Sequence, residues 1–120
     1  MRSVLLFTIS VVIIAVGLLF AFQKYCGGIY VQKNHSEIYS CSGGKTIAVQ
    51  FFSTSDNMLM FSKVAMPDGT EYSLPLAPSA SGSRYSNGVS LEIWLKGNEL
   101  TASKPNESGA MEQVYECKTK

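Results

Sequence analysis

The first 24 residues form one long apolar segment. Residues 4–22 are apolar apart from three small or hydroxyl-bearing residues, and the charges of Arg2 and Lys24 flank them. As a helix rising about 1.5 Å per residue, such a run spans roughly 28 Å, close to the hydrocarbon thickness of a bilayer. The pattern predicts a membrane-spanning helix within residues 1–24 that is kept as an anchor.

Two other interpretations of this segment stay open. It is longer than the apolar region of a secretory signal, and its end offers no small-x-small cleavage site, although cleavage is the main alternative. A lipoprotein signal, with Cys26 as the lipidated residue, is the third interpretation, but Tyr25 stands where a small residue is usual. All three export the rest of the chain, and we expect residues 25–36 to be a linker.

From residue 37 onwards, apolar and polar residues alternate in short runs. In residues 46–52, for example, Ile47, Val49 and Phe51 share one face. Runs of this kind predict strands, and turn signals such as Pro67-Asp68-Gly69 and Asn87-Gly88 separate them. The predicted strands cover residues 46–52, 59–64, 71–76, 90–96, 100–103 and 114–118. Because no helical period occurs here, residues 37–120 are predicted to form one all-β domain, a small antiparallel barrel or sandwich.

The three cysteines indicate in which kind of cellular compartment the domain folds. Cys41 and Cys117 bracket nearly the whole of this domain, which favours a disulfide and an oxidising compartment. Cys26 is left over, as a free, lipidated or intermolecular thiol. Three unpaired buried cysteines are the alternative.

Charge and composition exclude several classes of function. The chain has a formal net charge of +1, and residues 37–120 carry seven basic and nine acidic residues. Without a basic surface, nucleic-acid binding is not expected. One histidine and three widely spaced cysteines do not supply a zinc site, and no glycine-rich phosphate loop is present. No metal, cofactor or small-molecule substrate is expected.

Three motifs in order carry a family resemblance. They are Tyr39-Ser40-Cys41, the stretch SASGSRY at residues 79–85, and WLKGNE at residues 94–99, with Cys117 closing the domain. Together they resemble the MliC/PliC family, bacterial membrane-bound or periplasmic inhibitors of c-type lysozyme. The resemblance covers about residues 37–117 and implies an eight-stranded antiparallel β-barrel closed by a disulfide.

The resemblance also implies a mechanism and a location. A serine in a loop and a lysine in a turn would enter the lysozyme active-site cleft, and these fall on Ser81 and Lys96. The wider set expected to contact lysozyme or position the loop is Ser79, Gly82, Arg84 and Tyr85. The domain would face the periplasm of the bacterial envelope, tethered by residues 4–22, and would protect peptidoglycan.

Two other classes of function compete with this one. A non-inhibitory envelope domain that binds peptidoglycan or another envelope protein is the alternative. An enzyme is disfavoured: the carboxylates are scattered, and a nucleophilic Ser81 would need a base such as Lys96. Trp94 lies on the face opposite Leu91 and Ile93, where we expect a structural role.

Overall fold

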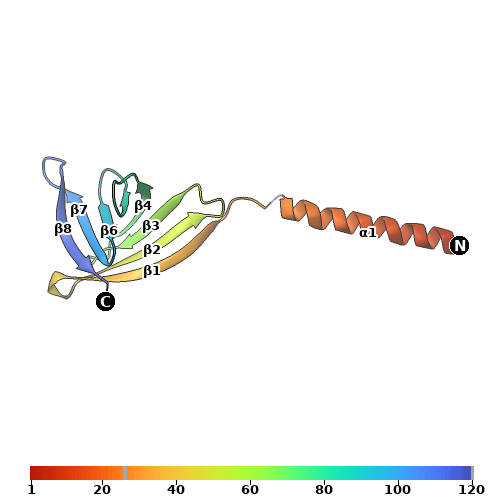
Figure 1. Ribbon diagram of the computed structural model, residues 1–120, viewed down its shortest axis with the longest axis horizontal. Coiled ribbons are helices and arrows are strands. Elements are labelled where there is room, and N and C mark those ends of the chain that lie inside the picture. Colours follow the sequence, from red (N-terminus) through yellow and green to blue (C-terminus); the bar gives the residue numbers. More distant parts are fainter. Residues whose placement is uncertain (26, 120) are drawn as a thin grey trace.

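The computed structural model describes residues 1–25 and 27–119, which form a long helix followed by a barrel (Figure 1). The helix, α1, spans Arg2–Tyr25. The strands are β1 (Val31–Cys41), β2 (Thr46–Thr54), β3 (Met60–Ala65), β4 (Glu71–Ala77), β5 (Ser83–Ser86), β6 (Glu92–Lys96), β7 (Glu99–Pro105) and β8 (Met111–Lys118), with a short 3₁₀ helix, η1 (Ser42–Gly44), between β1 and β2.

The helix α1 is long and apolar enough to cross a membrane, judged by length and composition alone. It has 24 residues, and its mean hydropathy is 2.9 over the most apolar window. No part of that window is buried against the rest of the protein, and Figure 1 shows α1 projecting away from the barrel. A helix that is apolar on all sides and uncovered by protein is typical of a membrane span or a signal segment.

Each strand pairs antiparallel with the next, and β8 returns to β1, so the sheet closes into an eight-stranded barrel. The alternation of apolar and polar residues along β2 explains which of its side chains form the core of the barrel. Ile47, Val49 and Phe51 point inward and are buried, whereas Thr46 and Gln50 are exposed. The fold predicted from alternation and from the family resemblance is confirmed.

The seam between β1 and β8 is one of the two shortest pairings in the barrel, together with that between β4 and β5. It consists of Ser40 opposite Lys118 and Cys41 opposite Cys117. The two cysteines form a disulfide across this pair, with their Cα atoms 4.0 Å apart. The predicted disulfide is therefore confirmed, and it covalently closes the barrel where few backbone hydrogen bonds do so.

The predicted linker is too long, because β1 begins at Val31 and not at residue 37. The side chains at the start of β1 are polar, so hydrophobic alternation could not reveal the strand. They are held from within the barrel: Gln32 donates to Ser53 Oγ at 3.2 Å, and Ser53 Oγ donates to Asn34 Oδ1 at 3.2 Å. His35 stacks on Phe51, with ring centroids 4.3 Å apart.

The alternation pattern also missed β5, which has four residues and one large apolar side chain, Tyr85. The pattern placed β6 from residue 90 and β3 from residue 59, whereas they begin at Glu92 and Met60. These two differences are small, because turns rather than side-chain alternation set the ends of strands.

Candidate functional site

The loop between β4 and β5, residues 78–82, contains the first predicted site residues. Ser79 Oγ donates a hydrogen bond to the carbonyl oxygen of Gly82 at 2.9 Å, which closes the loop on itself. The side chain of Ser81, between them, is exposed. The loop is therefore a small closed turn that presents the Ser81 hydroxyl to solvent.

Gly82 fits this loop against β6. Its φ is +71°, in the left-handed region that favours glycine. A Cβ atom at this position would lie 2.3 Å from the carbonyl oxygen of Leu95 and 2.8 Å from Cγ of Lys96. No side chain fits there, so glycine allows the loop backbone to lie directly on the stem of Lys96.

Trp94 ties the loop to β6 from the other side. Its indole Nε1 donates to the carbonyl oxygen of Ser81 at 2.8 Å. The Nζ atom of Lys96 lies 5.2 Å from the centroid of the same ring, a cation–π distance. The structure thus brings Ser81 and Lys96 together through one tryptophan, and the expected structural role of Trp94 is visible as loop support.

Arg84 braces the base of the loop. Its Nε donates to Glu92 Oε2 at 2.9 Å, and its Nη2 atom lies 2.7 Å from the same oxygen. Its Nη1 atom also donates to the carbonyl oxygen of Pro78 at 3.2 Å. Because its guanidinium binds both β6 and the loop, Arg84 is placed to position the loop.

Tyr85 lies in the barrel core, at 8% exposure, with its ring tilted against Phe51 at 5.6 Å between centroids. Burial raises the pKa of its phenol. A side chain this deeply buried supports the loop from below, and the structure does not bring it to the surface beside Ser81.

Lys96 ends β6, and the turn to β7 follows at Gly97 and Asn98. In the described part of the chain, the ion pairs are Arg84–Glu92, Lys104–Asp68 and Lys118–Glu99, so the Lys96 ammonium has no carboxylate partner. Lys118, 2.8 Å from Glu99, lowers the pKa of that carboxyl and occupies it. The Lys96 charge is therefore available to a partner.

A second feature lies beside the loop, and no sequence motif predicts it. A cavity of about 310 Å³ lies on the barrel side of Gly82, and His35, Glu37 and Tyr39 of β1 line it together with Gly97. Tyr39 donates its hydroxyl proton to Glu37 Oε2 at 2.7 Å, and burial, with this bond, raises the pKa of the phenol. No hydrophobic pattern predicts this cavity, because His35 lies in the polar first half of β1.

Two expectations concern other groups. Cys26 lies outside the described residues. Within residues 1–25 and 27–119, no cluster of three or more histidine, cysteine, aspartate or glutamate side chains could hold a metal ion.

Comparison with known proteins gives two matches. The family described as "Membrane-bound lysozyme-inhibitor of c-type lysozyme" matches residues 39–111, which include the β4–β5 loop and the β6–β7 turn. A curated relative from Cupriavidus necator, named "Membrane-bound lysozyme inhibitor of C-type lysozyme", is 40% identical over 63 residues. The match covers 52% of this chain and 47% of the relative, so the chain spans about half of that protein's length. No solved structure matches.

Proposed function

Because the chain belongs to the family of membrane-bound lysozyme inhibitors of c-type lysozyme, we propose that it inhibits a c-type lysozyme without being an enzyme. In this proposal the β4–β5 loop and the β6–β7 turn enter the active-site cleft, with Ser81 and Lys96 at the front. The observation that carries it is the contact of the Gly82 backbone with the Lys96 stem. This contact supports the proposal because it joins the Ser81 loop to the Lys96 stem, with the Lys96 ammonium over the Trp94 ring.

The chemistry of the cleft suits such a pair. A c-type lysozyme has two catalytic carboxyl groups, one protonated as the general acid and one ionised. A serine hydroxyl can donate and accept hydrogen bonds, so it suits a carboxyl group in either state. A lysine ammonium is a compact charge on a long stem, which suits the ionised carboxylate. Since Lys96 has no carboxylate partner of its own in the described part of the chain, it need not break an ion pair to bind.

Preorganisation supports the same assignment. Flexible loops lose conformational freedom on binding, and that cost is subtracted from affinity. Here the Ser79–Gly82 bond, the Trp94–Ser81 bond and the two contacts of Arg84 already hold the loop. Arg84 and Tyr85 are positioning residues in this proposal, and Ser81 and Lys96 are contact residues.

The location follows from α1. We assign this helix as a membrane anchor that places the barrel in the periplasm of a bacterial envelope. Its length, its hydropathy and its uncovered surface support the assignment. The membrane-bound character of the family and of the relative agrees with it.

The test is a double variant, Ser81→Ala with Lys96→Ala, in a protein that starts at residue 27 so that β1 is complete. Truncating a desolvated charge pair typically costs about 2–5 kcal/mol, so the inhibition constant should rise on the order of a hundredfold. It is measured by titrating the protein into a c-type lysozyme that is clearing a cell-wall suspension.

The matched control is Lys63→Ala with Ser73→Ala. These two exposed residues are directly opposite each other on β3 and β4, away from the loop. The control should inhibit as the unaltered protein does. Full inhibition by the Ser81/Lys96 variant would refute the proposed site. Absence of inhibition by the unaltered, folded protein, with retention on insoluble peptidoglycan, would refute the inhibitor function and favour an envelope-binding domain.

A further inference from the structure

An apolar surface lies where the chain enters the barrel. It consists of the segment Ile29–Val31 and the segment Met58–Met60, in which the β2–β3 turn leads into β3, and we call it the entry surface. The exposed fractions in the second segment are 85% for Met58, 51% for Leu59 and 40% for Met60. Ile29, Tyr30 and Val31 are 69%, 64% and 58% exposed. Six neighbouring large apolar side chains are therefore open to solvent.

Hydrogen bonds hold the two parts of the entry surface together. The amide of Ser55 donates to the carbonyl oxygen of Tyr30 at 2.8 Å, and the amide of Tyr30 donates to Ser55 Oγ at 3.2 Å. Val31 continues the contact by pairing with Thr54. The β2–β3 turn therefore stays beside the first residues of the barrel, wherever those residues are placed.

Internal hydrogen bonds hold the β2–β3 turn, with Met58 exposed on it. Asn57 adopts φ of +57°, and its amide donates to the carbonyl oxygen of Thr54 at 2.8 Å. The amide of Met58 donates to Asp56 Oδ1 at 3.1 Å, so the Asp56 carboxylate is turned back onto its own loop. The tip of the turn thus presents thioether and alkyl side chains, and its nearest acid is engaged internally.

Chain length places this surface close to the end of α1. Tyr30 is five residues beyond Tyr25, the last helical residue, and five extended residues reach at most about 17 Å. Figure 1 shows the β2–β3 turn at the end of the barrel nearest to α1. Lys24 lies in the last turn of the helix and Lys33 lies in β1, which gives basic flanks to the aromatic pair Tyr25 and Tyr30. Aromatic and basic residues at this position are typical of the membrane interface.

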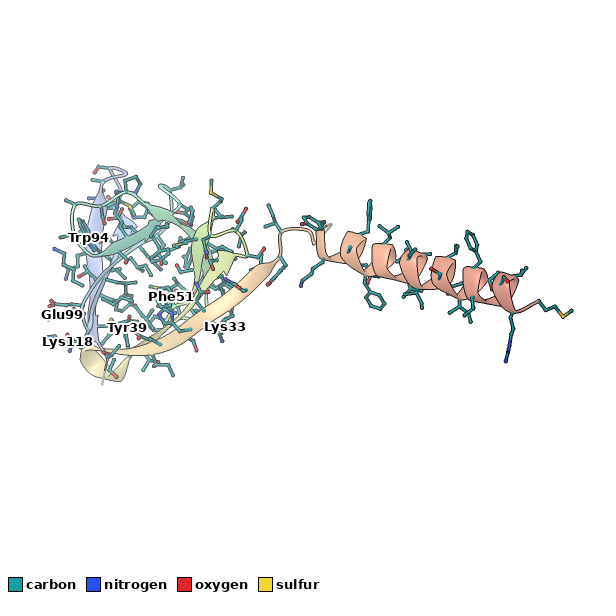
Figure 2. All side chains as sticks on the ribbon, turned by 45° about the vertical axis from the view of Figure 1, so that its right-hand side comes forward. Lys33, Tyr39, Phe51, Trp94, Glu99 and Lys118 are labelled. Carbon is teal, nitrogen blue, oxygen red and sulfur yellow. A yellow bond between two sulfur atoms is a disulfide. The ribbon has the colours of Figure 1, made fainter. Side chains whose placement is uncertain are left out.

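We propose that the entry surface rests in the interfacial layer of the membrane that α1 spans and so docks the barrel on the bilayer. This inference depends on the proposed insertion of α1 and goes beyond it, since a helix alone would leave the barrel free to tumble. The bilayer is the occupant because the chain passes from the helix into the barrel at this surface (Figure 1). Figure 2 places Trp94 and Glu99 on the side of the barrel remote from α1, with Lys33 on the near side. Docking would therefore direct the Ser81–Lys96 site away from the membrane.

The experiment uses the full chain in vesicles of phosphatidylethanolamine and phosphatidylglycerol. Met58→Cys carries an environment-sensitive fluorophore, in a Cys26→Ser background so that the new thiol is labelled selectively. The matched control is Val89→Cys, a 75% exposed apolar residue in the β5–β6 connection. Lipids with a nitroxide near the headgroup should quench the label at position 58 several-fold more than the label at position 89. Aqueous iodide should show the reverse order.

A second variant tests the cause of the quenching. Ile29→Asp with Leu59→Asp, added to the protein labelled at position 58, should move that label into water, whereas Val89→Asp should not. Equal iodide quenching at positions 58 and 89, in protein that co-floats with the vesicles, would overturn the docking and leave the insertion of α1 intact. Failure to co-float would overturn both. Lysozyme inhibition, measured on the same preparations, reports separately on the proposed function.

Discussion

At the scale of single residues, Gly82 is central to the packing of the β4–β5 loop against β6. Gly82→Ala would place a methyl group within contact distance of the Leu95 carbonyl oxygen and the Lys96 stem, in a backbone conformation that alanine disfavours. We expect the free energy of unfolding to fall by about 2–3 kcal/mol, since strain at such positions costs about 1–3 kcal/mol and the clash adds to it. Urea unfolding measures the change, and inhibition should weaken with it.

Gly88 is the matched control for this prediction. Its φ of +73° is nearly the same, but nothing lies within 4 Å of a Cβ atom built there. Gly88→Ala should therefore cost only the conformational strain of about 1 kcal/mol. Equal losses for the two variants would show that the contact with Leu95 and Lys96 does not hold the loop.

Tyr39 makes stability sensitive to alkaline pH. Its pKa is raised from 10.0, mainly by burial and then by the bond to Glu37, so the folded state keeps the phenol neutral after the unfolded chain ionises. The folded state then binds more protons, and the free energy of unfolding falls as pH rises above about 10. Tyr39→Phe should flatten that fall and cost about 1 kcal/mol at neutral pH. Urea unfolding at about pH 8 and pH 11 measures the fall in the free energy of unfolding for the unaltered protein and for Tyr39→Phe. An equal fall in both proteins would contradict this assignment.

The residues of the site differ in how far the sequence could predict them. Ser79, Ser81, Gly82 and Lys96 belong to short motifs, and the structure brings their segments together. The Glu37–Tyr39 bond could not be foreseen, because the polar first half of β1 gives no sign that these two residues share one face of a strand. Likewise, the burial of Tyr85 follows from its inward position in β5, opposite Ile93, and not from its motif.

At the scale of elements, the β1–β8 seam depends on its disulfide. Two residue pairs join these strands, and the disulfide closes a loop with a sequence separation of 76. In the chain-entropy description, a loop of this size is worth about 4 kcal/mol. Cys41→Ala with Cys117→Ala should lower the free energy of unfolding by about that amount in urea. Reduction of the unaltered protein should produce a similar loss, and a barrel indifferent to both treatments would contradict the prediction.

The strands that could be predicted are those with a clean inward face. In β2 and β6, buried residues such as Val49 and Ile93 alternate with exposed or half-exposed ones, and this is the signal that alternation detects. The start of β1 gives the opposite case. Gln32 and Asn34 are hydrogen-bonded to Ser53, so an interior that is locally polar leaves no hydrophobic pattern to read.

At the scale of the whole molecule, charge predicts slow, weakly steered binding. From the start of β1 at Val31 onwards, residues 31–120 carry eight basic and nine acidic side chains, a balance of −1. Against a basic lysozyme, this small charge should change the association rate by less than about tenfold between low salt and 0.15 M salt. Stopped-flow kinetics measure this, and Lys63→Glu, which lowers the net charge by two at a site away from the loop, should steepen the dependence. A strong dependence in the unaltered protein would show local steering by Lys96 or its neighbours.

The disulfide has a mechanical consequence for a tethered protein. A pull on α1 passes along the backbone of β1 to Cys41, crosses the disulfide to Cys117, and continues two residues further to Thr119. There the amide of Thr119 donates to the carbonyl oxygen of Asn98, in the turn that follows Lys96. In the proposed complex, tension between the membrane and the bound lysozyme would therefore run through covalent bonds almost to the β6–β7 turn. Part of the load on β1 would also pass to β2, because nine residue pairs join these two strands.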